Sequence, residues 1–373
     1  MGRVQYIHQL KAWPKFHWQH DQIVDVLANV RHKQGKLIGH MEALGFNLRN
    51  EANLHTITLD VIKSSEIEGE MLDADQVRSS IARRLGMDIA GLVPSDRNVD
   101  GIVEMMLDAT QNHEAKLTSE RLFAWHSAMF PTGTSGMQKI KVGAWRDNPI
   151  EDPMQVVSGA MGRERVHFEA PPGAGLEHEM ATFLDWFNQK MDMDPVLKAG
   201  VAHLWFVTIH PFDDGNGRIA RAIADMQLAR SDNNKQRFYS MSAQIRKERN
   251  VYYGILEKTQ KSNLDITPWL EWFLSCLDRA LDVTEETLSN VLMKAMFWKV
   301  HAKTHFNSRQ QKIINMMLDS FEGKLTSSKW SKLTKVSQDT ALRDIQDLVG
   351  RNVLIKDPAG GRSSNYLLGD VRD

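Results

Sequence analysis

The stretch from Thr208 to Arg221 combines residue types suited to phosphate chemistry, in the order Thr-Ile-His-Pro-Phe-Asp-Asp-Gly-Asn-Gly-Arg-Ile-Ala-Arg. Pro211 disfavours α geometry at His210, so we expect the preceding apolar helix to end there. We expect a second helix to begin near Asn216. The glycine-rich loop between the two helices places backbone N–H groups at a helix N-terminus, where an anion is favoured. The sequence therefore predicts an anion cradle between two helices.

Charged side chains around this loop supply the other parts of a phosphate-transfer site. Asp214 is placed to hold Mg²⁺, which usually takes one or two carboxylates together with phosphate oxygens. Arg218 and Arg221 are three apart on one helix face and can bind further phosphate oxygens. His210, an imidazole at the mouth of the loop, is placed to accept the proton of an incoming hydroxyl. A lone His-Pro or Asp-Gly-Asn-Gly is usually a turn, but joined at this spacing they favour a site.

The same stretch resembles the Fic motif, HxFx(D/E)GNGRxxR, and matches each of its fixed positions. Members of that family typically transfer AMP from ATP to a protein hydroxyl. The resemblance implies that His210 is the base for a target Ser, Thr or Tyr, and that Asp214 holds Mg²⁺ on the nucleotide. The remaining nucleotide-binding positions that it implies are the anion hole and two phosphate-binding arginines: Gly215, Asn216, Gly217, Arg218 and Arg221. The intact Gly-Asn-Gly favours AMP transfer over the phosphate transfer of the Doc branch.

Residues 154–169 resemble the flap of the family, a hairpin that holds a target segment by strand addition. Two short β-like runs, 154–158 and 165–169, flank a glycine-containing turn, which is a hairpin signal. The resemblance places Val156, Val157 and Ser158 along the nucleotide. A purely structural hairpin is the alternative. The run Gly143–Arg146 resembles the strand that enters the flap, and we assign it no chemistry.

Three residues on an expected helix, 251–260, stand where family members place adenine-pocket residues. They are Tyr252, Tyr253 and Gln260. The alternative is that the two tyrosines belong to the core, as aromatic pairs on helices often do.

The segment from Ser64 to Gly69 resembles the inhibitory motif of the family, (S/T)xxxE(G/N). Ser64 and Glu68 are four residues apart and therefore share a helix face. The resemblance implies that the Glu68 carboxylate pairs with Arg221, occupies the place of the γ-phosphate and inhibits the enzyme. Taken alone, the segment would be an ordinary helix end.

Two other glutamates, Glu66 and Glu70, lie near this motif but off the face that Ser64 shares with Glu68. In some relatives the motif glutamate also aligns water for the removal of AMP. A de-AMPylase activity that depends on Glu68 is therefore an alternative function.

Helical spacing dominates the rest of the chain, and the predicted fold class is mainly α. We expect a Fic helical core with a β-hairpin flap, preceded by an N-terminal helical domain and followed by a winged helix-turn-helix. The expected helices outside the C-terminal part are 19–47, 53–68, 74–85, 98–113, 119–130, 177–191, 196–209, 216–230 and 251–260.

Residues 298–373 differ from the rest because their 13 Lys/Arg exceed their 8 Asp/Glu. The expected order is helix 309–321, helix 327–333, helix 337–350, and two strands, 353–355 and 366–368, on either side of Gly360-Gly361. Three helices and a two-stranded wing are typical of a winged helix-turn-helix.

This C-terminal part raises a competing function, a DNA-binding regulator. The residues that could face a DNA groove are Gln338, Arg343 and Gln346 in helix 337–350 and Arg362 in the wing. Three aspartates of the same helix would repel phosphate: Asp339, Asp344 and Asp347. Protein docking or homodimerisation through the winged helix is the other alternative.

Composition limits the class of protein. The 373 residues carry Lys+Arg 46 against Asp+Glu 47, which argues against a chain built throughout to coat nucleic acid or membrane. The single cysteine, Cys276, excludes an internal disulfide framework and favours a reducing compartment. We find no signal peptide and no membrane span, so we expect a cytoplasmic protein. The expected domains are 1–95, which is helical and carries the inhibitory motif at 64–69, 96–292, which is catalytic, and 298–373, which is the winged helix.

Overall fold

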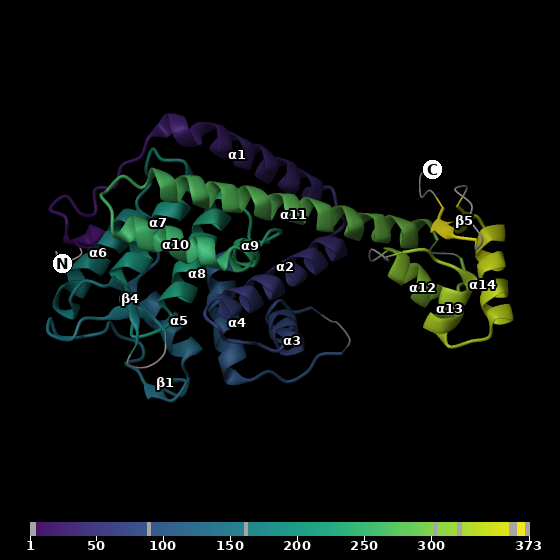
Figure 1. Cartoon of the computed structure of the whole chain (residues 1–373), viewed down its shortest axis with the longest axis horizontal. Helices are drawn as coiled ribbons and strands as arrows, with labels where there is room; N and C mark the ends of the chain where they lie inside the picture. Colours follow the sequence, from purple (N-terminus) through teal and green to yellow (C-terminus); the bar gives the residue numbers. More distant parts are fainter. Residues whose placement is uncertain are drawn as a thin grey trace. The chain divides into compact units, whose positions relative to one another are not determined.

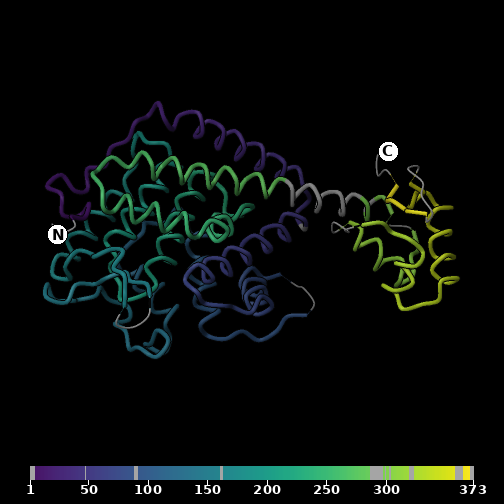
Figure 2. Tube along the Cα trace, in the orientation of Figure 1, coloured from purple at the N-terminus to yellow at the C-terminus, as the bar shows by residue number. Residues whose placement is uncertain are grey.

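The structure, a computed structural model, describes residues 5–87, 91–159, 163–301, 304–318, 323–357 and 364–369, without the side chains of 47, 286–296 and 299. The described backbone is mainly helical, with three two-stranded antiparallel sheets. Packing divides the chain, whose path is traced in Figure 2, into two compact units. Unit 1 is Met1–Thr284 and unit 2 is Glu285–Asp373. The predicted mainly α fold is confirmed.

The first part of unit 1 is a series of helices that follows a short 3₁₀ turn, Ile7–Gln9. They are α1 (His20–Glu42), α2 (Phe46–Ile67), α3 (Ala74–Arg84), α4 (Arg97–Gln111) and α5 (Ser119–Met129). Side-chain caps begin two of them, since Asp73 accepts from the backbone N–H of Gln76 and Thr118 accepts from that of Arg121. The sequence misplaced the start of α2, which begins seven residues earlier than expected, because extended backbone at Gly45 separates it from α1.

Two small hairpins follow α5. They are β1 (Thr134–Ser135) with β2 (Gln138–Lys139), and β3 (Gln155–Ser158) with β4 (Arg165–Glu169). The second hairpin, called the flap from here on, confirms the predicted hairpin, although residues 160–162 of its turn lie outside the described residues. Its base packs against the N-terminal segment, where the rings of Tyr6 and Phe168 meet edge to face with centroids 5.2 Å apart. The expected strand at 143–146 is absent from this described stretch, which is irregular.

The second part of unit 1 contains the helices that carry the predicted motif. They are α6 (Leu176–Asn188), α7 (Pro195–Ile209), α8 (Asn216–Asp232), α9 (Met241–Lys247), α10 (Arg249–Gln260) and α11 (Thr267–Val300). Every residue of α7 from Val196 to Ile209 is buried, as are nearly all residues of α8 up to Ala229. A helix buried on all faces lies at the centre of its domain, and Figure 1 shows both helices enclosed by other helices of unit 1. The loop between them is therefore held by the core.

Unit 2 consists of the end of α11, three helices and a hairpin. These are α12 (Ser308–Leu318), α13 (Ser327–Thr334), α14 (Gln338–Gly350), β5 (Leu354–Lys356) and β6 (Tyr366–Leu368). Trp330, Ile313 and Ile345 are fully buried in its own core. The predicted order of three helices and two strands is confirmed. The expected end of the first helix at Phe321, the turn Gly360-Gly361 and the wing residue Arg362 lie outside the described residues.

None of the helices described here combines the length and apolar character needed to cross a bilayer. Cys276 is a buried free thiol in α11, and burial raises its pKa.

Candidate functional site

The loop begins where α7 ends at Ile209, as Pro211 predicts. His210 adopts the left-handed conformation, with φ 53° and ψ 57°, which is uncommon for a residue other than glycine. Arg146 holds this backbone in place: its Nε donates to the His210 carbonyl at 2.7 Å and its Nη2 to the Pro171 carbonyl at 2.7 Å. Burial lowers the pKa of Arg146 to about 10, so this buried clamp stays charged. Sequence reasoning gave Arg146 no role, and no local pattern distinguishes it from a surface arginine.

The imidazole of His210 has a defined tautomer. Its Nδ1 lies 3.2 Å from the Val207 carbonyl oxygen, which only accepts hydrogen bonds, so Nδ1 carries the proton. Burial lowers the pKa of His210 to about 4, and the nearby Arg146 cation acts in the same direction. The ring is therefore neutral at pH 7, with the lone pair of Nε2 free to accept a proton.

Two polar side chains brace the loop from within. The Asn216 Oδ1 accepts from the backbone N–H of Phe212 at 2.9 Å, and its Nδ2 donates to the Phe212 carbonyl at 2.8 Å. Asp213 Oδ2 accepts from the backbone N–H of Lys141 at 2.8 Å. Gly215 caps α8 with φ 80°, a conformation that favours glycine. The side chain of Asn216, predicted at the anion hole, thus shapes the loop. Its backbone N–H lies at the start of α8, where an anion would be favoured.

Asp214 lies beside the cradle and is itself held in place. Its Oδ1 accepts from the Gly215 backbone N–H at 2.6 Å, and its Oδ2 accepts from the Ser135 hydroxyl. The described residues contain no group of three or more potential metal ligands. A single ordered carboxylate fits Mg²⁺ better than it fits a protein-enclosed metal, because Mg²⁺ usually completes its octahedron with phosphate oxygens and water.

The segment from Ser64 to Glu68 contacts Arg221 as predicted. The Glu68 Oε1 lies 2.8 Å from Arg221 Nη2, and the Ser64 hydroxyl accepts from Arg221 Nε at 2.9 Å. The Ser64 carbonyl accepts from Nη2 at 2.8 Å. Glu68 immediately follows α2, and Gly69 then turns the chain with φ 88°. Two hydrogen bonds to Ser64 and an ion pair with Glu68 therefore hold a guanidinium that is almost fully buried.

The Glu68 carboxylate also lies against the first turn of α8. A Cβ at Gly217 would overlap Glu68 Oε1, so only glycine permits this approach. The Tyr253 hydroxyl donates to Glu68 Oε2 at 3.2 Å. The carboxylate thus occupies the helix N-terminus where an anionic ligand would be favoured.

A second ion pair joins the same segment to the motif. Glu70 pairs with Nη1 of Arg218, whose guanidinium stacks over the Phe130 ring at 5.2 Å from its centroid. Helical spacing placed Glu70 off the face that Ser64 shares with Glu68, because such spacing assumes that the helix continues. The turn at Gly69 instead redirects the chain toward Arg218. Glu66 points elsewhere, to Lys63 at 2.7 Å and Arg246 at 3.3 Å.

A cavity of about 480 Å³, called the site cavity from here on, brings together predicted residues from four parts of unit 1. Predicted residues that line it are Glu68, Val157, Ser158, His210, Gly217, Tyr252, Tyr253 and Gln260. Its volume is in the range of pockets for drug-sized ligands. Tyr252 is only 1% exposed, and its hydroxyl lies 2.9 Å from His203 Nε2. Gln260 is also buried and donates to the Thr208 hydroxyl at 3.2 Å. The flap and α10 therefore form walls of the cavity into which His210 opens.

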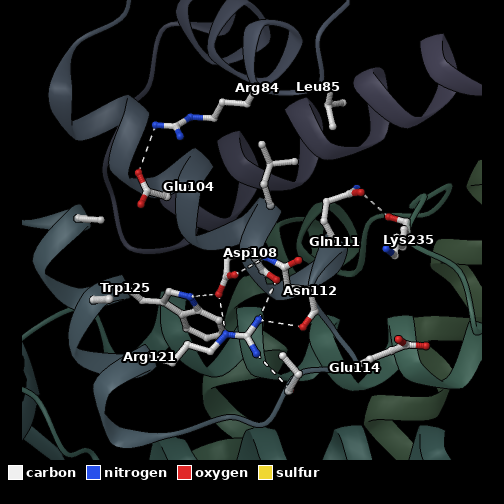
Figure 3. Close-up of a pocket in the computed structure, with 14 residues that line it drawn as sticks. Arg84, Leu85, Glu104, Asp108, Gln111, Asn112, Glu114, Arg121, Trp125 and Lys235 are labelled. Atoms are coloured by element: carbon white, nitrogen blue, oxygen red, sulfur yellow. Dashed lines mark hydrogen bonds and ion pairs between the residues drawn. The ribbon is translucent and has the colours of Figure 1, made fainter.

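A larger pocket of about 890 Å³, the second pocket, lies between α3, α4 and α5 and contains none of the predicted site residues. Arg121 dominates it (Figure 3), with Nε 2.6 Å from Asp108 Oδ2 and Nη2 2.9 Å from the Asp108 carbonyl. The Trp125 indole donates to the same carboxylate at 2.7 Å.

Comparisons with known proteins agree with the geometry. Residues 116–228 match the model of the Fic/DOC family, and residues 6–87 match a domain of unknown function, DUF4172. The chain is 34% identical over 137 residues to "Protein adenylyltransferase Fic" of Culex quinquefasciatus, covering 35% of this chain and 25% of that protein. It is 32% identical over 227 residues to the protein of that name in Drosophila yakuba, covering 60% and 41%. The chain thus spans a quarter to two-fifths of the length of these relatives.

Two solved structures share the fold. A Fic family protein from Desulfovibrio desulfuricans G20 aligns with a TM-score of 0.53 at 21% identity, over 94% of this chain and 97% of that one. A Fic domain containing signaling protein from Bacteroides thetaiotaomicron VPI-5482 aligns with a TM-score of 0.50 at 21% identity, over 70% and 95%. Residues 116–228 therefore form a Fic/DOC family region, which a DUF4172 region at residues 6–87 precedes.

Proposed function

We propose that this chain is a Mg²⁺-dependent protein adenylyltransferase, which transfers AMP from ATP to a Ser, Thr or Tyr hydroxyl of a target protein and is restrained by Glu68. One observation carries the proposal: a neutral histidine with a free Nε2 opens into a ligand-sized cavity at a helix N-terminus that an internal carboxylate occupies. A site that binds a carboxylate in this position is suited to phosphate when the carboxylate leaves. The relatives named as protein adenylyltransferases support the same chemistry.

The residues suggest a direct mechanism. The target hydroxyl gives its proton to Nε2 of His210 as its oxygen bonds to the α-phosphorus of ATP, and the bond to the β-phosphate oxygen breaks to release pyrophosphate. Backbone N–H groups at the start of α8 and the guanidinium of Arg221 stabilise the charge on the phosphate oxygens. Asp214 would hold Mg²⁺, which neutralises charge on the phosphates.

Glu68 acts by competition. The same N–H groups of the Arg221 guanidinium cannot bind the Glu68 carboxylate and a phosphate at once. The native protein should therefore transfer AMP slowly, because ATP first has to displace a carboxylate from the cradle.

The test is AMP transfer from α-labelled ATP, measured on the protein itself and on proteins of a cell extract. We expect strong labelling by Glu68→Gly, and loss of labelling of the extract proteins when His210→Ala is added. Labelling by neither the native protein nor Glu68→Gly would contradict the proposal, once circular dichroism shows that both are folded.

A second activity, removal of AMP, has one observation in its favour. The Glu68 carboxylate lines the same cavity as His210 and is about one-third exposed, so it could orient a water molecule. The two activities predict opposite effects of one substitution. If Glu68 serves hydrolysis, Glu68→Gly should lose the release of AMP from a modified target while it gains transfer.

For unit 2 we propose a docking role, with DNA as one candidate partner. Gln338, Arg343 and Gln346 are exposed on α14, as a groove-facing surface requires. The repulsion between DNA phosphate and the aspartates of α14 is weaker than the sequence suggests. Asp344 turns inward to Arg309 at 2.7 Å, and Asp347 pairs with Arg351 at 2.7 Å. A salt-dependent mobility shift of duplex DNA that Arg343→Ala weakens would favour DNA, whereas its absence at low salt would favour a protein partner.

A further inference from the structure

Three side chains at the mouth of the site cavity form one continuous hydrogen-bonded chain. The Ser158 hydroxyl lies 2.6 Å from His167 Nε2, and His167 Nδ1 lies 2.7 Å from Glu257 Oε2. Ser158 comes from β3, His167 from β4 and Glu257 from α10, and all three line the cavity. Hydroxyl, imidazole and carboxylate in this order are the arrangement of a nucleophile, its base and the group that orients the base.

The charge of Glu257 determines which of the two His167 ring nitrogens donates to it. Burial opposes its ionisation, but hydrogen bonds from Lys261, His167 and Arg165 lower its pKa to about 2. An ionised carboxylate only accepts, so His167 Nδ1 carries a proton and donates it. In the neutral ring, Nε2 is then the acceptor for the Ser158 hydroxyl. This is the tautomer in which His167 can take the serine proton.

A β-bulge in the flap explains how His167 reaches both partners. The register passes from the pair Val156–Phe168 directly to the pair Val157–Val166, so His167 faces the irregularity without a direct partner on β3. Bulges often re-aim a side chain in this way. The Glu257 carboxylate is fixed on its other oxygen by Arg165 and Lys261, each at 2.8 Å.

A structural role alone accounts for only part of this series of hydrogen bonds between Ser158, His167 and Glu257. The contacts of His167 and Arg165 with Glu257 join the flap to α10. Ser158 and His167, however, both belong to the flap, so their hydrogen bond does not itself join the flap to α10. The contact instead orients an exposed hydroxyl at the cavity where we place the nucleotide.

We propose that Ser158 is a nucleophile activated by His167 and Glu257, and that it is an acceptor of AMP in self-modification. This inference rests on the proposed AMP transfer. The Ser158 Oγ bonds to the α-phosphorus of ATP, its proton passes to Nε2 of His167, and the bond to the β-phosphate oxygen breaks to release pyrophosphate. The product is a phosphodiester between Ser158 and AMP.

The first experiment maps the modified residue by mass spectrometry after Glu68→Gly is incubated with saturating ATP and Mg²⁺. We expect AMP on Ser158, and its rate of formation should fall about 100-fold or more when His167→Gln is added, as for the loss of a general base. Glu257→Gln should also slow it, because the orienting charge is lost. The matched control is His178→Gln, an exposed histidine of α6 outside the cavity, which should leave the rate unchanged.

The second experiment needs no nucleotide. A fluorophosphonate probe reacts with an activated serine by forming an O–P bond and releasing fluoride. We expect it to label Ser158 in the native full-length chain, and to label it much more slowly in His167→Gln.

The outcomes separate this inference from the proposed function. AMP on other hydroxyls but none on Ser158 would overturn the inference, as would equal rates of Ser158 modification with and without His167. Neither outcome would contradict the proposed adenylyltransferase activity. If Glu68→Gly transfers AMP to nothing, the proposed function and the acceptor role both fall. The probe then decides the remaining part: labelling that depends on His167 supports an activated Ser158, and no labelling overturns it.

Discussion

The site cavity and the second pocket, both in unit 1, differ in what their polar groups bind. The second pocket is nearly twice as large, about 890 Å³ against about 480 Å³. Its central cation, Arg121, is engaged by an aspartate and by carbonyls near the end of α4, so its hydrogen bonds serve the fold. In the site cavity, His210 keeps Nε2 free, and a carboxylate lies at a helix N-terminus that suits a ligand. Polar groups that the fold leaves unused, rather than volume, distinguish the candidate functional pocket.

The largest expected effect is the loss of the base. His210→Ala in the Glu68→Gly background should lower the rate of AMP transfer to target proteins by about 10²–10⁴-fold. ATP affinity, measured by calorimetry, should change by no more than a few-fold, because the imidazole faces the hydroxyl rather than the phosphates. Transfer at the Glu68→Gly rate would show that the free Nε2 is not what distinguishes this cavity.

The pH dependence follows from the same group. The pKa of His210 is lowered to about 4, so the base is neutral above that pH and becomes protonated below it. We expect transfer by Glu68→Gly to persist at pH 5.5, where an ordinary histidine would be largely protonated, and to fall as the pH approaches 4. A loss of rate centred near the ordinary histidine pKa would contradict the buried, neutral imidazole.

The next effect is release of the internal carboxylate. Glu68→Gly should raise transfer tenfold or more, since it frees Arg221 and the start of α8. Arg221→Ala should not activate, because it removes a phosphate ligand together with the restraint. The double variant should resemble Arg221→Ala alone, a non-additive result expected for residues that act on one step. Additive effects would mean that the pair seen at 2.8 Å does not control activity.

A smaller gain is expected from the second ion pair. Glu70→Gln should raise transfer a few-fold, because Arg218 keeps its position over Phe130 but loses its carboxylate partner. Glu66→Gln is the matched control on the same segment, since Glu66 pairs with Lys63 and Arg246 instead. A fall in transfer, with a raised KM for ATP, would show that Glu70 positions Arg218 for the nucleotide rather than restraining it.

The sequence predicted most of the site because its parts are local. The break at Pro211, the helix start near Asn216 and the spacing of Ser64 and Glu68 each depend on neighbouring residues. The residues it missed depend on tertiary structure. Arg146 binds the His210 carbonyl from 64 residues away, and Glu70 reaches Arg218 only because the chain turns at Gly69.

The Ser158–His167–Glu257 chain shows the same division. The hairpin was predictable from its turn and its two short β-like runs, but the bulge that turns His167 toward Glu257 was not. Register irregularities depend on which strand pairs form, and a single sequence does not specify them.

The smallest effect on activity is expected in the second pocket. Arg121→Ala should leave the AMP transfer rate of folded Glu68→Gly unchanged, since the arginine lies outside the site cavity. It should instead lower the free energy of unfolding by about 1–3 kcal/mol, because Asp108 and several carbonyls lose a charged donor. His210→Ala should show the reverse, a large loss of rate with little change in thermal stability. A substantial change in rate for Arg121→Ala at equal folded fraction would contradict the contrast, because it would give the larger pocket a part in the reaction.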